Sequence, residues 1–211
     1  IEFLNACMER VNKMTGQLVG KRAFITGSLS GIGLGIATKF AQEGASLVLH
    51  GLGDQKVIDS AVSAVKSAGA SRVEAFVTDL RDSNATEKLV ADILKSGDLD
   101  ILVNNAGIQH TAPISEMPRD KWNDIIAVNL SSYFDTMRLV LPHMKARGHG
   151  RVINISSVHG LVASVAKAPY VAAKHGVVGL TKVAALEYAS VGDRSNGGLT
   201  INAICPGWVE T

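Results

Sequence analysis

Six short apolar runs recur along the chain, and segments with helical spacing of apolar residues separate them. The runs span 22–26, 46–50, 73–77, 99–103, 151–155 and 199–204. Between them, apolar residues every three or four positions predict helices over roughly 32–43, 54–68, 83–95, 120–146 and 168–190, with Pro142 kinking or ending the fourth. Strands that are almost entirely apolar and alternate with helices are typical of a parallel sheet covered on both faces. The pattern therefore predicts a doubly wound α/β fold.

The same pattern predicts a single domain. No internal repeat or low-complexity linker interrupts the 211 residues. Residues 1–20 are polar and irregular, and we expect a poorly ordered leader there, followed by one domain over 21–211. The polar, glycine-rich stretch 192–198 is most simply a surface loop. The sequence stops within Pro206-Gly207-Trp208-Val209-Glu210-Thr211, which resembles a connecting loop, so we expect a fragment or a shortened form of a longer protein.

Composition and charge narrow the classes of partner. Apolar residues make up 46% and charged residues 19% of the chain, as in a globular protein with a substantial core. A formal net charge of +2, without a Lys/Arg cluster, argues against a nucleic-acid partner. No apolar run approaches the roughly 18 residues of a membrane span, and the start lacks the apolar core of a secretion signal. Cys7 and Cys205 have no metal-ligand spacing and fit reduced thiols, so we expect a cytoplasmic protein without a metal site or a membrane partner.

A glycine-rich turn follows the first predicted strand, as Thr26-Gly27-Ser28-Leu29-Ser30-Gly31-Ile32-Gly33. Glycines allow the backbone to turn tightly and approach a pyrophosphate, and the helix that begins here points its first amides at the anion. The position between strand and helix in the first βαβ unit favours a dinucleotide site. A tight turn without a ligand is the alternative interpretation.

Polar residues also follow the fourth and fifth predicted strands. Asn104-Asn105-Ala106-Gly107 ends the fourth and Ser156-Ser157 ends the fifth, with Tyr170 thirteen positions beyond Ser157. In a doubly wound sheet, ligands bind outside the carboxyl ends of the strands. A hydroxyl and a phenol are therefore expected to converge on one substrate oxygen.

Tyr170 and Lys174 form the motif with the clearest chemistry. Their separation of four residues places both side chains on one face of a helix. A cation held there would favour the phenolate, lowering a phenol pKa from about 10 toward neutrality. A tyrosine of that kind can exchange a proton with a substrate oxygen near pH 7. Considered alone, the pair is also compatible with an ordinary amphipathic helix surface.

In combination, these motifs resemble those of the short-chain dehydrogenase/reductase family, from about Lys21 to Thr211. The matching positions are Thr-Gly-x-x-x-Gly-x-Gly at 26–33, Asn-Asn-Ala-Gly at 104–107, Asn129 in Ala127-Val128-Asn129-Leu130, Tyr-x-x-x-Lys at 170–174 and Pro206-Gly207-x-x-x-Thr211. The resemblance implies a Rossmann-like domain, hydride transfer with a nicotinamide cofactor, and a homo-oligomer that is a dimer or a tetramer. It also implies that the substrate lid and the last strand of full-length relatives are missing after Thr211.

The resemblance further implies a catalytic tetrad of Asn129, Ser157, Tyr170 and Lys174. Tyr170 would be the acid and base, and Ser157 would hold the substrate oxygen. Lys174 would lower the pKa of the tyrosine and bind the nicotinamide ribose, while Asn129 would fix a water that relays protons from the lysine. Ser156 is expected to bond to the backbone at its strand end instead.

Cofactor contacts follow from the same resemblance. The implied set comprises Gly27, Ser30, Gly31, Ile32, Gly33, Asp79, Leu80, Asn105, Ala106, Gly107, Tyr170, Lys174, Pro206, Gly207, Val209 and Thr211. An acidic residue ending the second strand would select NAD, but this strand ends in His50-Gly51-Leu52-Gly53, with Asp54 placed late. A 2′-phosphate would require arginine or lysine, and residues 28–30 and 50–53 contain neither. We therefore expect NAD.

Within the family, three further segments resemble the D-3-hydroxybutyrate dehydrogenases, namely Gly107-Ile108-Gln109-His110, residues 157–164 and Lys167-Ala168-Pro169-Tyr170. The resemblance places Gln109, His159 and Lys167 around the substrate carboxylate, and an amide, an imidazole and an ammonium can together bind such a group. Trp208 is expected to close over the substrate, with a core tryptophan as the alternative.

The implied substrate pair is D-3-hydroxybutyrate and acetoacetate. Two other functions stay open at this point. One is a reductase of the same family for another carbonyl, such as a 3-oxoacyl thioester or a sugar. The other is a shortened, non-catalytic form that binds a nucleotide or a partner subunit.

Overall fold

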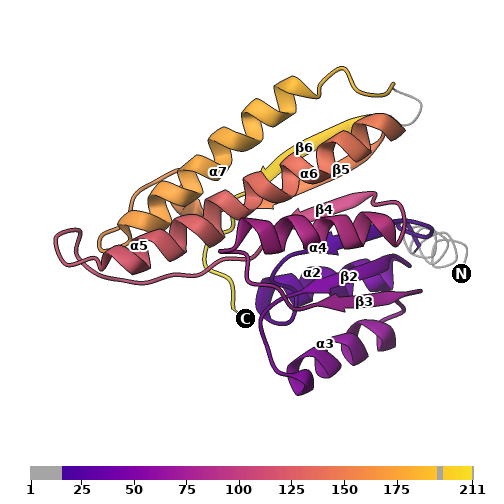
Figure 1. Ribbon diagram of the computed structural model, residues 1–211, viewed down its shortest axis with the longest axis horizontal. Coiled ribbons are helices and arrows are strands. Elements are labelled where there is room, and N and C mark those ends of the chain that lie inside the picture. Colours follow the sequence, from indigo (N-terminus) through magenta and orange to yellow (C-terminus); the bar gives the residue numbers. More distant parts are fainter. Residues whose placement is uncertain (1–15, 194–196, 211) are drawn as a thin grey trace, which may run out of the picture.

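A six-stranded parallel sheet runs through the centre of the computed structural model, which describes residues 16–193 and 197–210 (Figure 1). Its strands are β1 Arg22–Ile25, β2 Ser46–His50, β3 Val73–Phe76, β4 Ile101–Asn104, β5 Gly150–Ile155 and β6 Leu199–Ile204. They lie in the order β3-β2-β1-β4-β5-β6, and every neighbouring pair is parallel. Each strand coincides with one of the predicted apolar runs.

Helices cover both faces of the sheet. On one face, α2 Gly31–Gln42 and α3 Gln55–Ser67 pack against alternate strand residues such as Ala23 and Ile25. On the other face, α4 Ser83–Lys95, α6 Ser132–Arg147 and α7 Ala168–Glu187 pack around the intervening residues, among them Phe24. Because side chains alternate along a strand, the apolar run of β1 supplies both cores. The predicted single, doubly wound, Rossmann-like sheet is confirmed.

The predicted helix over 120–146 consists of three consecutive segments. α5 Arg119–Ile126 leads into a π-helical turn, η1 Ala127–Ser131, and then into α6. Pro142 lies inside α6, which continues beyond it to Arg147. The prediction of one regular helix is therefore wrong at η1, where Asn129 lies. A π-turn inserts an extra residue into a helix without changing its apolar composition, so the hydrophobic pattern does not reveal it.

The remaining predictions concern the ends and the loops. Residues 1–15 of the predicted leader lie outside the described residues, whereas 16–20 form turns that lead into β1, with the Leu18 N–H donating to the Glu43 carbonyl at 2.9 Å. The glycine-rich loop is described except for residues 194–196. Among the helices of the described residues, none is both long and apolar enough to span a membrane.

The order of the strands reverses between β1 and β4. The chain proceeds outward from β1 to β2 and β3, then crosses back to β4 and continues to β5 and β6 on the other side. Helices that follow β1 and β4 therefore leave in opposite directions, which opens a crevice at the carboxyl ends of these two strands. The glycine-rich turn and the Asn104–Gly107 segment both lie at this crevice.

Candidate active site

The turn between β1 and α2 brings backbone close to backbone at the crevice. Gly27 and Gly31 have φ angles of +64° and +54°, in the region that favours glycine. A Cβ at Gly27 would lie 2.8 Å from the Ala106 Cα, and a Cβ at Gly33 would collide with the Gly27 carbonyl oxygen. Side chains are thus excluded at Gly27 and Gly33, where backbone forms the wall of the crevice.

The start of α2 is open toward this crevice. Ser30 is the N-cap residue, but its side chain makes no capping hydrogen bond. By contrast, Asp54 and Asp82 accept backbone N–H bonds at the starts of α3 and α4. The uncapped amides of α2 and its helix dipole favour an anion at this position.

A cavity of about 350 Å³ lies over the start of α2. It is lined by Gly27, Leu29, Ser30, Gly31, Ile32, Gly33, Gly51, Leu52, Asn105, Ala106 and Gly107. Eight of the predicted cofactor residues are among them. The structure therefore brings the glycine turn and the Asn-Asn-Ala-Gly segment together around one volume, which fits the diphosphate of a dinucleotide.

Thr26 and Asn105 fix the two sides of this cavity. The Thr26 Oγ1 accepts the backbone N–H groups of Asn105 and Ala106 at 2.9 and 3.0 Å. In return, the Asn105 Nδ2 donates to the Thr26 and Gly27 carbonyls, both at 3.0 Å. These four bonds join segments nearly 80 residues apart and set the width of the crevice between β1 and β4.

His50 supports the turn from the β2 side, a role absent from the sequence-based predictions. It is 2% exposed, its Nδ1 lies 3.4 Å from the Gly27 amide nitrogen, and its Nε2 lies 2.9 Å from the Thr78 carbonyl oxygen. The neutral tautomer with the proton on Nε2 satisfies both partners. Burial lowers the pKa of His50 below its ordinary value, against the opposing influence of the Thr78 carbonyl. The only sign of this supporting role in the sequence was a histidine at the end of a predicted buried strand.

A second cavity of about 350 Å³ continues the crevice toward β3. The predicted contacts Asp79 and Leu80 line it, together with His50, Leu52 and Arg81. Hydrogen bonds from the Arg81 side chain lower the pKa of the Asp79 carboxyl. The surface that lines this end of the crevice is mostly apolar, which suits the base and ribose of a dinucleotide.

At the other end, the crevice enters a cleft of about 270 Å³ beside β4 and β5. Its lining consists of Ile32, Asn105, Gly107, Ile108, Gln109, Ile155, Ser156, Ser157, Tyr170, Lys174, Pro206 and Gly207. Three of the four predicted catalytic residues thus share one cleft. Because Ile32, Asn105 and Gly107 also line the first cavity, the cleft and the crevice form a continuous channel.

Lys174 is buried at the bottom of this cleft, with 3% of its surface exposed. Its Nζ donates to the Ile155 carbonyl at 2.8 Å and to the Tyr133 hydroxyl at 3.2 Å. Burial lowers the pKa of Lys174 to about 8, although Cys205 nearby opposes the change. The Nζ also lies 5.7 Å from the centroid of the Tyr170 ring, so the cation is held next to the phenol.

Asn129 lies behind the cleft and is fully buried. Its Oδ1 accepts the Ile108 N–H at 2.8 Å, and its Nδ2 donates to the Ile108 carbonyl at 2.9 Å. The side chain therefore anchors the segment that follows β4 to the π-turn η1. Its predicted role in holding a water stays a prediction, and the geometry assigns it the positioning of Ile108.

The two serines after β5, which both line the cleft, make different hydrogen bonds. The Ser157 Oγ accepts the His159 N–H at 3.2 Å. The Ser156 Oγ donates to the Lys174 carbonyl at 2.9 Å. The predicted backbone bonding of Ser156 is thus confirmed, and the predicted contact of Ser157 with a substrate oxygen stays a prediction.

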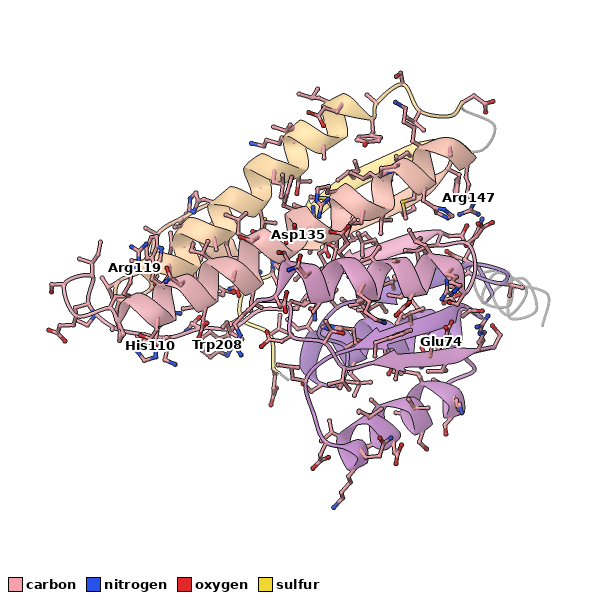
Figure 2. The ribbon with its side chains drawn as sticks, in the orientation of Figure 1. Glu74, His110, Arg119, Asp135, Arg147 and Trp208 are labelled. Carbon is pink, nitrogen blue, oxygen red and sulfur yellow. The ribbon has the colours of Figure 1, made fainter. Side chains whose placement is uncertain are left out.

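Several predicted substrate residues lie outside the cleft lining. His159 packs its ring edge-on against Tyr170 at a centroid distance of 6.2 Å, and its Nδ1 is buried without a hydrogen-bond partner in the described chain. Lys167 is the half-buried N-cap residue of α7. Trp208 is 98% exposed on the segment after β6 (Figure 2), which excludes the core alternative, and its closure over the substrate stays a prediction. Val209 is 47% exposed, and Thr211 lies outside the described residues.

Comparisons with known proteins agree with this geometry. The profile of the family described as short chain dehydrogenase matches residues 21–211. D-beta-hydroxybutyrate dehydrogenases of Cupriavidus necator and Rhizobium meliloti are 50% and 47% identical, over 92% and 90% of this chain and 72% of each relative. The crystal structure of NAD+-bound xylitol dehydrogenase superposes with a TM-score of 0.84 at 27% identity, over 92% of this chain and 73% of that one. The chain belongs to the short-chain dehydrogenase family of oxidoreductases.

Proposed function

We propose that this chain catalyses reversible hydride transfer between NAD and a small 3-hydroxy acid, with D-3-hydroxybutyrate and acetoacetate as the substrate pair. The observation that carries the proposal is the single cleft in which Ser157, Tyr170 and Lys174 meet at the end of a dinucleotide-sized channel. The choice of substrate is supported by the two D-beta-hydroxybutyrate dehydrogenases to which the chain is 50% and 47% identical.

The cofactor proposal depends on the two walls of the channel. The glycine turn and the uncapped start of α2 would hold the diphosphate, and Lys174 would bind the nicotinamide ribose. The Asp54 carboxylate caps α3 through the Val57 N–H at 2.9 Å and lines neither cavity of the crevice, so it offers no support for a ribose contact. NAD is instead favoured over NADP because Leu29, Gly51 and Leu52 carry no charge for a 2′-phosphate, and the Arg81 guanidinium in the adjoining cavity is already paired with Asp79 and Asp124. Bound NAD would accept the hydride from the hydroxyl-bearing carbon.

The proton is moved by the side chains of the cleft. In the oxidation direction, the Tyr170 phenolate removes the substrate hydroxyl proton while a C=O bond forms and the hydride leaves the same carbon. Ser157 donates to the substrate oxygen and orients it. The Lys174 ammonium beside the ring stabilises the phenolate by its charge. In the reduction direction the same tyrosine returns the proton, so one residue is both acid and base.

Recognition of the substrate carboxylate is assigned to Gln109, His159 and Lys167. Gln109 lines the cleft, where its Nε2 lies 3.4 Å from the Thr111 Oγ1. The unpaired, buried Nδ1 of His159 supports a ligand, because buried polar atoms usually have partners. The Lys167 ammonium would neutralise the charge of the substrate carboxylate.

A second candidate function is reduction of an uncharged ketone by the same catalytic residues. It is favoured by the position of His159 and Lys167, which lie outside the lining of the cleft. This function would need no carboxylate partner, so activity on the uncharged ketone would survive Lys167→Ala.

The test is the rate of NAD reduction with each enantiomer of 3-hydroxybutyrate. We expect the D enantiomer to be oxidised, with NAD preferred to NADP. Tyr170→Phe should lower kcat by at least about a hundredfold, because it removes the acid and base. The matched control, Tyr188→Phe at the far end of α7, should retain activity. Nucleotide binding without turnover of either enantiomer, or turnover that survives Tyr170→Phe, would contradict the proposal.

A further inference from the structure

The hydroxyl of Tyr133 reaches Lys174 from the α6 side of the cleft. Tyr133 is fully buried and lies 41 residues before the lysine. Its Oη is 3.2 Å from the Lys174 Nζ, and the Nζ lies 5.1 Å from the centroid of its ring. The hydroxyl itself donates toward the carbonyl oxygens of Ile155 and Ala106, at 3.0 and 3.2 Å.

We propose that Tyr133 is a positioning residue for Lys174, whose hydroxyl fixes the ammonium between β5 and Tyr170 and keeps it protonated during turnover. This inference rests on the proposed function for its catalytic meaning. The contact between the two side chains can nevertheless be tested on the protein without substrate or cofactor.

The hydrogen bonds of the ammonium support this role. A lysine ammonium has three N–H groups. Two are directed at the Ile155 carbonyl and the Tyr133 hydroxyl, both of which are buried and fixed by the fold. The third is therefore left for the cleft that Lys174 lines. Without Tyr133, the ammonium would keep only one buried acceptor, and its direction would be less constrained.

The charges around Lys174 lead to the same conclusion. Burial lowers the pKa of Lys174 to about 8, so its charge depends on every acceptor within reach. In the described chain, the titratable groups that face it are Tyr133 from α6, Tyr170 from α7 and Cys205 after β6. Burial raises the pKa of Tyr133, so its hydroxyl stays neutral and can accept from the ammonium while donating to Ile155. His159 contacts the Tyr170 ring instead.

The direct test is the titration of Lys174 in the protein alone. Lysine labelled with ¹⁵N gives one ammonium signal per residue, and the signal that Lys174→Met removes identifies Lys174. Tyr133→Phe deletes the hydroxyl acceptor and keeps the ring, so we expect the midpoint of this titration to fall by about one pH unit. Tyr188→Phe is the matched control, since Tyr188 lies about 21 Å further along α7. An unchanged midpoint in Tyr133→Phe would overturn the proposal.

The activity of the same variant gives a second readout. A midpoint that moves from about 8 to about 7 leaves roughly a fifth of the protonated lysine at pH 8 and more than three quarters at pH 6.5. The ratio of wild-type to Tyr133→Phe turnover should therefore be about fivefold at pH 8 and below twofold at pH 6.5. A purely structural defect would lower turnover by the same factor at both values, and that result would count against the proposal.

A different variant keeps the test possible if Tyr133→Phe does not fold. The chain has three tyrosines, so Tyr170→Phe with Tyr188→Phe leaves Tyr133 as the only one. Its Raman doublet reports whether the hydroxyl accepts as well as donates a hydrogen bond. Adding Lys174→Met should change the doublet to that of a donor alone, and an unchanged doublet would refute the contact. A shifted lysine titration in a protein without dehydrogenase activity would support the inference and reject only the proposed function.

Discussion

Lys174 and His50 are both buried basic side chains, and their surroundings give them opposite charge states near neutral pH. Lys174 donates hydrogen bonds to two buried acceptors, the Tyr133 hydroxyl and the Ile155 carbonyl, which suits an ammonium. His50 accepts from Gly27 and donates to Thr78, which suits a neutral ring. Two hydrogen-bond patterns thus separate a charged residue at the catalytic end of the channel from an uncharged one at the nucleotide end.

The neutral state of His50 leads to a prediction about stability and pH. Unfolded histidine protonates below about pH 6.5, whereas burial lowers the pKa of His50 in the folded protein. The unfolded state therefore binds more protons as the pH falls from 6.5, so the free energy of unfolding decreases there, by up to about 2 kcal/mol at pH 5. Urea denaturation at pH 7 and pH 5 measures this difference.

The contribution of His50 can be separated from that of other groups. His50→Gln cannot protonate, so it should lose this part of the pH dependence, while the exposed His175→Gln should keep it. If His50→Gln retains the full decrease between pH 7 and pH 5, another group is responsible and the neutral assignment of His50 is wrong.

Four polar side chains tie α6, β4, β5 and α7 together through the core. The Thr136 Oγ1 donates to the Asn104 Oδ1 at 2.7 Å, and the Asn104 Nδ2 donates to the Asn154 Oδ1 at 3.0 Å. The Asn154 Nδ2 then donates to the Thr181 Oγ1 at 2.9 Å. All four residues are buried. Because unpaired polar groups are costly in a core, this series of hydrogen bonds fixes how α6 and α7, which carry Tyr133 and Lys174, align with the sheet.

Thr181→Val tests this chain of hydrogen bonds with almost no change in volume. The variant leaves the Asn154 amide with only a weak contact to the Met137 sulfur at 3.4 Å. We expect the free energy of unfolding to fall by about 1–3 kcal/mol, as measured by chemical denaturation. Thr38→Val, on the partly exposed face of α2, should change it by less than about 0.5 kcal/mol. Equal effects of the two variants would show that the buried bonds contribute nothing specific.

The π-turn η1 changes the directions in which the side chains of its helical segment point. Its extra residue lets Asn129 bond both backbone groups of Ile108 while Tyr133, four residues later, still points at Lys174. A regular α-helix would place these two side chains on one face, one turn apart. The irregular turn thus allows one helical segment to contact both the segment after β4 and Lys174.

A network of hydrogen bonds around Arg22 stabilises the end of the sheet opposite the candidate active site. The buried Arg22 side chain of β1 contacts residues of β3 and α4 there. Its guanidinium donates to the Glu74 carboxylate at 2.9 Å, the Ser96 hydroxyl at 2.6 Å and the Ile93 and Gly97 carbonyls at 2.9 and 2.8 Å. Arg22 lines neither the cleft nor the two cavities of the crevice, so it can be changed without altering their lining (Figure 2 labels its partner Glu74).

Arg22→Met should therefore lower stability and leave catalysis intact in the folded fraction. It removes the donor to the Ile93 and Gly97 carbonyls and to the Glu74 carboxylate, which keeps its pair with Arg72 at 3.4 Å, so we expect a loss of about 1–3 kcal/mol. Arg138→Met is the control, because the Arg138 side chain is 43% exposed in its pairs with Glu87 and Asp135, at 3.6 and 3.9 Å, and its loss should cost less than about 1 kcal/mol. Thermal unfolding together with kcat checks both. A variant of Arg22 as stable as that of Arg138 would contradict this account.

The sequence alone determined the features that depend on local spacing and composition. Continuous apolar runs placed the six strands, and apolar residues every three or four positions placed most of the helices, because burial of both faces or of one face imposes these patterns. The glycine turn and the Tyr170–Lys174 pair were predictable for the same reason, since each is set by residues a few positions apart. The geometry of Asn129, the π-turn around it and the positions of His159, Lys167 and Trp208 relative to the cleft were not.

Only the tertiary structure decided which distant residues complete the site. Tyr133 meets Lys174 across 41 positions, and His50 meets Gly27 and Thr78 across 23 and 28. Such contacts depend on how helices pack on the sheet, and neither residue belongs to a short motif that spacing could reveal. The charge of Lys174 is likewise a tertiary property, because its pKa of about 8 follows from burial between β5, α6 and α7.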